Sequence, residues 1–501
     1  MSELQFDTQK NNANITVAET NLSPNPGALN TVNAAGIPSL ITIASIIGIV
    51  GILAIVIPLT ICLSGNNKKN YTKSPLNSTD YNEKDNYIIA NYIIENTDDE
   101  TLIFHSSYLD LIESMKINDN VANINNSIKF ENIGNNKVEI KFKDSLTSLN
   151  DLFTNCHALN EVNLNNLNTE KVTSTADMFS GCKNLQKINF NDLDTRNINN
   201  ISNMFSSCEK LTSIDVSIFD NDKLIDVQGL FFNCSGLTTI NFGDFNTKNV
   251  INMSKLFSGC SSLTEINMNE DNNFNTGNVI DMSYMFHYCN NLENLNLDNF
   301  DTSKVIHMNN MFDKCESLKE LNLKSFDTKN VQNMFFMFGN CSNLESLDLS
   351  NFDTSSTSDM FGMFKDCTNL KSLDISSFDT SSVEDMGEMF GNCNNLESVQ
   401  LSNFEVQNVE SMLGMFHKCN SMTNLSVPNF NTENLEEASY LLSDCEKLQY
   451  IDFSKFNTIK LEGYENITKN LPEKGTLICN KNIFNLSAEF PSKWTIQDIN
   501  E

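Results

Sequence analysis

The hydrophobic positions of this chain recur with a fixed period. Relative to each of twelve cysteines, Met or Leu stands four residues before, Phe three before in all but the last case, and apolar residues six and eight after. Each step between cysteines is 26 residues, except for one of 29. A constant period of this length is typical of a repeat solenoid. The cysteines are Cys156, Cys182, Cys208, Cys234, Cys260, Cys289, Cys315, Cys341, Cys367, Cys393, Cys419 and Cys445.

Within one coil the pattern predicts a short helix followed by a short strand. The coil of residues 301–326 carries apolar residues at Val305, Met308, Phe312 and Cys315. Successive members of this set are 3, 4 and 3 residues apart, which is typical of one face of a helix. Residues 301–303 read Asp-Thr-Ser, which are types that cap helix N-termini. Leu321 and Leu323 then alternate with Asn322, as in a half-buried strand.

Neither element buries its apolar side alone, so the coils must stack. We therefore predict an α/β solenoid of about twelve coils, with helices outside and one parallel sheet on the concave face. The repeated apolar positions would form the core. A hydrophobic ligand site or a thiol active site is disfavoured, because a catalytic site would not be copied twelve times. In one coil this core is Met337, Phe338, Cys341, Leu344, Leu347 and Leu349.

Outside the repeats the periodicity is lost, and composition defines the remaining segments. Polar residues without periodicity predict disorder, and Asn, Ser and Lys predict a linker. Terminal coils of a solenoid need caps, so we expect one on each side, with Trp494 covering the last coil. The predicted segments are 1–36 disordered, 37–63 transmembrane helix, 64–85 linker, 86–144 N-terminal cap, 145–460 solenoid and 461–501 C-terminal cap.

Residues 37–63 contain no charged residue. As a helix they are long enough to cross a hydrocarbon core of roughly 30 Å. A cleaved signal peptide is disfavoured, because the preceding region is long and acidic and no small-x-small site follows. A lipid-modified Cys62 is an alternative. Three lysines at 68–73 follow the stretch and one precedes it, which by the positive-inside rule favours cytoplasmic repeats, although a long translocated domain can override that rule.

The net charge of −31 lies mostly on residues 145–501. An acidic array repels nucleic acid and anionic lipid, and the sequence has no basic patch, so nucleic-acid binding is not expected. No GxGxxG, Walker, GxSxG or HExxH motif is present. We therefore expect no enzyme activity, no catalytic residue and no cofactor.

The cysteines and histidines also predict no metal site and no disulfides. Equivalent positions on neighbouring coils lie roughly 4.8 Å apart with parallel side chains, whereas a disulfide needs converging Cβ atoms about 3.8 Å apart. The twelve cysteines are interpreted as free thiols packed as small hydrophobes. Zinc ligands commonly occur as CxxC or HxxxH pairs, and neither is present. His287 and His417 hold the same repeat position five coils apart, and are expected to be solvated.

Binding by a solenoid is expected on its exposed positions, often on the concave sheet. Seven residues after each cysteine, the outward strand position carries Asn, Asp, Gln or Ser. Such a row suits carbohydrate, cations or weak multivalent contacts, and it would also serve only to keep the sheet face soluble. A second candidate is the lengthened loop at 269–273. The candidate binding residues are Asn241, Asn267, Asn296, Asn322, Asp348 and Asp374.

The repeat resembles a known family. MFGNCSNLESLDLSNFDTSSTSDM (337–360) and MFKDCTNLKSLDISSFDTSSVEDM (363–386) are similar to the BspA-type leucine-rich repeat of bacterial and protist surface proteins. The resemblance covers about residues 138–460, and the closing LPEKGT…W segment is similar to that family's terminal cap. It implies a leucine-rich repeat solenoid at the cell surface, involved in adhesion, without enzyme activity. It supplies no binding residue.

Together these observations predict a membrane-anchored cell-surface protein that binds extracellular protein or carbohydrate by many weak contacts. Two other functions stay open. One is a structural or antigenic coat component without a specific ligand. The other is an intracellular scaffold tethered to the membrane, which the lysines at 68–73 favour.

Overall fold

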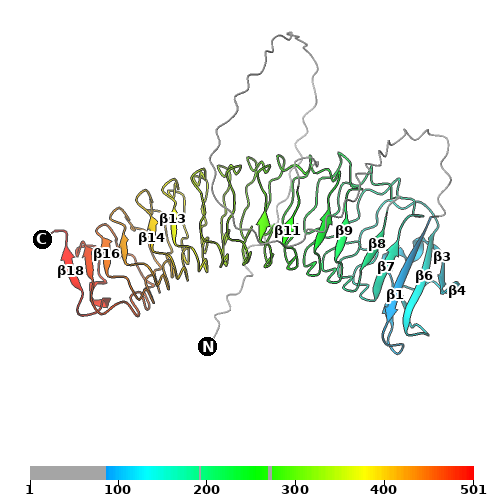
Figure 1. The fold of residues 1–501 in the computed structure, drawn as a ribbon, viewed down its shortest axis with the longest axis horizontal. Helices are drawn as coiled ribbons and strands as arrows, with labels where there is room; N and C mark the ends of the chain where they lie inside the picture. Colours follow the sequence, from blue (N-terminus) through cyan, green and yellow to red (C-terminus); the bar gives the residue numbers. More distant parts are fainter. Residues whose placement is uncertain (1–85, 191–192, 269–273, 501) are drawn as a thin grey trace, which may run out of the picture. The chain divides into compact units, whose positions relative to one another are not determined.

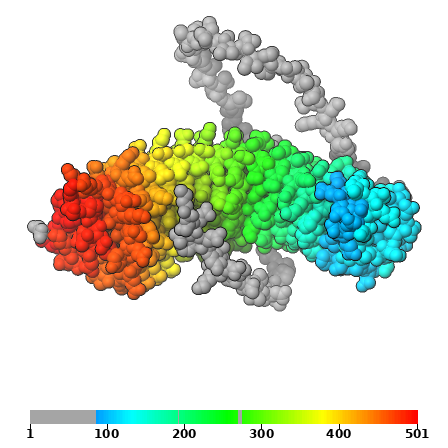
Figure 2. Space-filling view, turned by 90° about the horizontal axis from the view of Figure 1, so that it is seen from below, coloured from blue at the N-terminus to red at the C-terminus, as the bar shows by residue number. Residues whose placement is uncertain are grey.

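The structure is a computed structural model that describes residues 86–190, 193–268 and 274–500. The coils of the repeat follow one another in sequence order (Figures 1 and 2). Throughout the described ranges, no helix has the length and hydrophobicity needed to cross a membrane. The predicted segments 1–36 and 37–63, the whole linker 64–85 and the loop at 269–273 lie outside the described residues.

The prediction of a helix in each coil was wrong. The described helical structure consists of two 3₁₀ turns, η1 (Ser106–Leu111) and η2 (Ser487–Glu489), and both lie outside the twelve coils. The segment before each cysteine is a series of turns. Its apolar residues are nevertheless buried as predicted, including Val305, Met308 and Phe312. The molecule is therefore a β-solenoid, and not an α/β array of helix and strand pairs.

Two residues with left-handed backbone conformation interrupt each turn segment. They stand five residues and one residue before the cysteine, as Asn203 (φ 53°) and Ser207 (φ 58°) do before Cys208. A right-handed helix cannot continue through such residues. Many coils place Asn, Asp or Gly at these positions, the residues that tolerate this conformation best. Consecutive turns thus bury apolar residues that are spaced 3 and 4 apart, just as a helix would.

The turn segments bond to each other between coils. The backbone N–H groups of Asn203 and Phe205 donate to the carbonyls of Gln228 and Leu230 one coil later, at 2.8 and 3.1 Å. Between them, Met204 donates within its own coil to Ile201 at 3.2 Å. Backbone groups that a helix would satisfy internally are here shared with the neighbouring coil.

The Phe-Asp-Thr sequence also joins neighbouring coils. The Thr302 hydroxyl donates to the carbonyl of Asp327 and accepts from its N–H group, both at 2.8 Å. The Asp301 carboxylate accepts from the N–H of Ser303 at 3.0 Å. This is an Asx turn and not the predicted helix cap, because no helix follows.

The strands are short, and they do not form the single continuous sheet that was predicted. Before the coils lie β1 (Tyr87–Ile94), β2 (Thr101–Leu102), β3 (Ile112–Ile117), β4 (Asn120–Ala122), β5 (Ser127–Ile128) and β6 (Gly134–Phe142). In the coils lie β7 (Leu159–Asn163), β8 (Lys187–Asn189), β9 (Ser213–Asp215), β10 (Thr239–Asn241), β11 (Glu265–Ile266), β12 (Asn294–Leu295), β13 (Ser372–Asp374), β14 (Ser398–Gln400), β15 (Asn424–Ser426) and β16 (Tyr450–Phe453). The last two are β17 (Thr476–Cys479) and β18 (Thr495–Asp498).

These strands group into several separate sheets. Their orders are β4-β3-β6-β1-β7-β8, β10-β9, β11-β12, β13-β14, β15-β16-β17-β18 and β2-β5. At the start of the array, β1 pairs antiparallel with β7. At its end, β17 and β18 extend the sheet in parallel from β16. Both outermost coil strands therefore have their edges paired.

A second ladder runs without interruption eight residues before the cysteines. Single parallel bridges join each coil to the next, from Ser148 to Gly463. Gly463 belongs to one more coil than the sequence pattern predicts. In that coil Leu471 takes the place of the cysteine, and Asn466 and Asn470 have the two left-handed conformations. The repeat therefore continues past residue 460 in its backbone geometry and keeps part of its side-chain pattern: Ile467, Leu477 and Cys479 are buried at the repeat positions, whereas Thr468 replaces the Phe.

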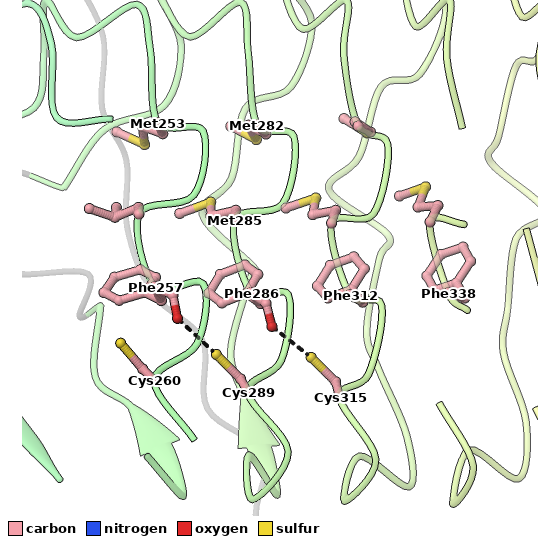
Figure 3. Packing of buried hydrophobic residues seen from close by; sticks show 14 of the residues in the cluster. Met253, Phe257, Cys260, Met282, Met285, Phe286, Cys289, Phe312, Cys315 and Phe338 are labelled. Atoms are coloured by element: carbon pink, nitrogen blue, oxygen red, sulfur yellow. Dashed lines mark hydrogen bonds between the residues drawn. The ribbon is translucent and has the colours of Figure 1, made fainter. Parts of the chain in front are cut away.

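The core is a set of stacked columns (Figure 3). Phe312 and Phe338 of neighbouring coils stack with ring centroids 5.6 Å apart and planes 6° apart. Each cysteine from Cys182 onward donates its S–H group to the carbonyl of the Phe column one coil earlier, as Cys315 does to Phe286 at 3.1 Å. The twelve cysteines are buried and free. The prediction of packed free thiols is confirmed.

Candidate functional site: the polar strand face

The strand face consists of the outward side chains five and seven residues after each cysteine. All six candidate binding residues lie there, on six successive coils, and all are exposed. Asn241 ends β10 and Asp374 ends β13, whereas Asn322 and Asp348 lie in coils without an assigned strand. The row that the sequence predicts is therefore present at the surface, on a partly irregular backbone.

The acidic candidates also have a structural role. Asp348 accepts from the N–H and hydroxyl groups of Ser350 at 3.1 and 2.7 Å, and Asp374 accepts from the N–H of Ser376 at 3.0 Å. These Asx turns end the strand segment of each coil. The hydrogen bonds from serine lower the pKa of both Asp348 and Asp374, so both carboxylates are charged at neutral pH. In each aspartate, one carboxylate oxygen accepts the hydrogen bonds that form the turn.

Two of the amide candidates bond to the preceding coil, and two bond within their own coil. Asn241 donates to Asp215 at 2.8 Å, and Asn322 donates to Asp298 at 2.7 Å. Asn296 accepts from the N–H of Asp298 at 2.9 Å. Asn267 donates to Glu265 at 3.3 Å within its own coil. The face thus consists of amides and carboxylates linked by hydrogen bonds. These bonds fix the positions of the amide side chains, which stay exposed to solvent.

The strand face has a hollow that the sequence did not indicate. Its volume is about 490 Å³, and it lies where β8 and β9 are not paired. Ile188, Ile214 and Ile240 contribute apolar side chains to it. Lys187 and Asn241 are among its polar lining residues, so one of the six candidates borders this hollow. The hollow arises from a break in pairing, which the regular period of the sequence conceals.

The two histidines are not solvated as predicted. His287 is half-buried, with its Nε2 atom 3.2 Å from a carboxylate oxygen of Asp313. His417 is half-buried with Nδ1 3.7 Å from Asp444, and burial lowers its pKa. In the described part of the chain, no group of three or more His, Cys, Asp or Glu side chains could hold a metal ion.

The repeats match a known family. A family model described as "Mycoplasma protein of unknown function, DUF285" matches residues 147–269, 261–373 and 359–476. The chain belongs to the DUF285 family. The resemblance to BspA-type leucine-rich repeats is confirmed, because the matched residues are the coils that carry it. Solenoids of this class commonly present extended binding surfaces.

Solved structures similar to this DUF285 chain include two bacterial leucine-rich repeat proteins. One, from Bacteroides ovatus, is 18% identical and covers 74% of this chain and 90% of its own, with a TM-score of 0.42. One from Eubacterium ventriosum is 14% identical and covers 60% and 79%, with a TM-score of 0.26. Among curated proteins, none matches this chain.

Proposed function

We propose that this DUF285 protein is a cell-surface array that binds extracellular protein or carbohydrate by many weak contacts. The proposal rests on the strand face. It presents exposed amides and carboxylates at the same position of successive coils, from Asn241 to Asp374. A ligand made of repeating units would find an exposed amide or carboxylate at the same position of each of these coils.

Multivalency explains how such a face binds without a deep pocket. Each exposed Asn or Asp offers one or two hydrogen bonds that compete with water and are worth little alone. When several contacts are linked on one rigid support, the later contacts form at a high effective concentration. Affinity should then depend on the number of coils.

The cell-surface location rests on the sequence. The uncharged stretch at 37–63 predicts attachment to a membrane, and the family resemblance favours an extracellular array. The lysines at 68–73 favour the opposite orientation. Protease added to intact cells decides between them. Extracellular coils would be digested, and protection of the coils until the cells are lysed would favour an intracellular scaffold.

The strand face is tested by a four-site variant in which Asn296, Asn322, Asp348 and Asp374 are replaced by Ala. We expect attachment to host cells or glycan to weaken about tenfold or more, because four contacts are lost from a multivalent face. A matched control replaces four exposed glutamates outside that face, namely Glu384, Glu410, Glu436 and Glu462. Circular dichroism confirms that both variants fold. Equal attachment by the parent and the strand-face variant would contradict the proposal.

Array length gives an independent test. Deleting residues 301–352 removes two coils, with Asn322 and Asp348, and joins Phe300 to Asp353, which keeps the Phe-Asp-Thr junction in register. The shortened array should fold and attach less strongly. Attachment that does not depend on length, together with no ligand in a low-affinity screen, would favour a coat component without a specific ligand.

A further inference from the structure

The turn segments of two consecutive coils, those before Cys341 and Cys367, carry an aromatic cluster that the sequence period does not reveal. We call it the ring platform, and it consists of Phe335, Phe336 and Phe361. The Phe335 and Phe361 rings belong to consecutive coils and stack with centroids 5.6 Å apart and planes 15° apart. Phe336 lies 4.8 Å from Phe335 and 5.7 Å from Phe361. All three side chains are half-buried, so part of each is open to solvent.

Glycines in the following coil leave space for two of the rings. A Cβ atom on Gly362 would lie 2.5 Å from the Phe336 ring, and one on Gly387 would lie 2.7 Å from the Phe361 ring. Any larger residue would push these rings away from the surface. Phe336 and Phe361 thus each lie against a glycine of the following coil, whereas Phe335 stacks on Phe361.

Phe336 occupies a backbone position that suits aromatic residues poorly. Its φ of 51° is left-handed, and the next coil has Gly362 at the same position. Asn310 fills it in the coil before. A bulky residue in this conformation costs on the order of 1 kcal/mol or more. Tyr284 and Tyr440 hold the same position in two other coils, so aromatic side chains recur there despite this cost.

Acceptor groups border the platform. Asn333, Asp359 and Asp385 stand two residues before the platform position of their coils and are half-buried. One side-chain oxygen of each accepts a backbone N–H group, at 2.8, 3.0 and 2.8 Å. Asn333 also donates to the second oxygen of Asp359 at a long 3.4 Å. These carboxylates retain capacity for further donors.

We propose that the ring platform binds a neutral, extended, β-linked polysaccharide that runs along the array. The inference rests on the proposed binding function and names its ligand class and a second site. The flat C–H face of a pyranose ring matches an exposed phenyl ring, and two successive sugars would meet Phe335 and Phe361 in turn. Sugar hydroxyls would donate to Asp359 and Asp385. These carboxylates and the acidic array exclude anionic polysaccharides.

A protein partner fits the platform less well. A specific protein interface needs about 800 Å² on each side, whereas the three rings span two coils. Protein hot spots favour Trp, Tyr and Arg. Lys365 lies over the Phe336 ring and pairs with Glu388 at 3.6 Å, so its charge is already matched within the array.

The test is titration of the full chain with a β-1,4-linked glucose hexasaccharide, with the α-1,4-linked hexasaccharide as comparison. We expect the β-linked chain to bind more tightly. Replacing Phe335 and Phe361 by Leu keeps apolar volume and removes the flat rings, so affinity should fall about tenfold. Phe361→Tyr keeps the ring and should bind as the parent does. Melting curves establish that each variant is folded.

Two results would overturn the inference. They are the absence of binding of the β-linked hexasaccharide to the parent at millimolar concentration, and unchanged binding to the Leu variant. The strand-face variant separates this inference from the proposed function. If that variant loses attachment while the Leu variant attaches and binds sugar normally, the strand face is the binding surface and the ring platform is not.

Discussion

From Cys182 onward, each cysteine of the repeat combines packing with a hydrogen bond from its thiol. The Cys341 side chain is buried, and its Sγ atom donates to the Phe312 carbonyl of the preceding coil at 3.2 Å. The same carbonyl column also accepts the cysteine N–H within each coil, as Phe312 does from Cys315 at 3.0 Å. Cysteine suits this position because it is small and apolar and still carries a weak donor.

Substitution of Cys341 tests this account. Cys341→Ala removes the sulfur and its hydrogen bond, so unfolding should become easier by about 1 to 2 kcal/mol. Cys341→Asp buries an unpaired charge and should cost more than about 4 kcal/mol. Denaturant midpoints measure both. The native parent should also resist alkylation, and rapid labelling of most of its thiols would contradict a buried ladder.

Alkaline pH should destabilise the array through these thiols. Burial raises the pKa of Cys289 and of Cys367 from 9.0 to about 12. The neutral thiol is therefore favoured in the folded state. This stability is complete below the unfolded pKa of about 9 and is lost as pH rises toward about 12. Melting temperatures across this range should fall, and less steeply in Cys367→Ala than in the parent. An equal slope would show that other groups dominate.

At the scale of one coil, the turn segment and the Phe-Asp-Thr sequence decide the conformation. Each coil places its left-handed residues at fixed positions, and each buried Thr bonds to the backbone of the next coil. These bonds connect equivalent residues of neighbouring coils. A coil in isolation would lack half of the partners of its turn segment, so the element forms only in the stack.

Thr302→Val tests the contribution of this connection. Valine has nearly the shape of threonine but neither donates nor accepts, so the Asp327 N–H group would lose its acceptor. We expect a loss of about 1 to 3 kcal/mol, together with faster hydrogen exchange at Asp327. The exposed Lys329→Ala is the matched control and should change stability by less than about 0.5 kcal/mol. Equal effects of the two substitutions would argue against the hydroxyl bridge.

At the scale of the whole array, stability is a sum over neighbouring coils. Each internal coil contacts two others, whereas the outermost coils depend on the strands that flank them. Nearest-neighbour coupling of this kind allows the ends to open before the centre.

Hydrogen exchange measures this gradient directly. The Phe338 N–H bonds to the Met363 carbonyl at 2.9 Å, and the Leu442 N–H makes the same kind of bond to Ile467 at 3.0 Å. Because the two bonds are alike, any difference in protection reports position in the array. We expect stronger protection at Phe338. Uniform protection at both amides would mean that the array unfolds as one cooperative unit.

The sequence determined the features that depend on burial. The period, the core columns, the free thiols and the outward polar row all follow from which side chains must avoid water, and the structure places Val305, Phe312, Cys315 and Asn322 accordingly. The family match agrees with this repeat. The spacing of apolar residues specifies which face of a segment is buried, and it can be read from the residue types alone.

Only the tertiary structure decided the backbone between those side chains. Spacings of 3 and 4 fit a helix and also fit consecutive turns, and the choice depends on left-handed residues such as Asn203 whose N–H groups bond to the next coil. The same holds for the ring platform. Phe335 and Phe361 are distant in sequence and become neighbours because coils stack in register, and Gly362 and Gly387 of the following coils leave room for the Phe336 and Phe361 rings. Contacts between coils are long-range interactions, so local sequence pattern cannot specify them.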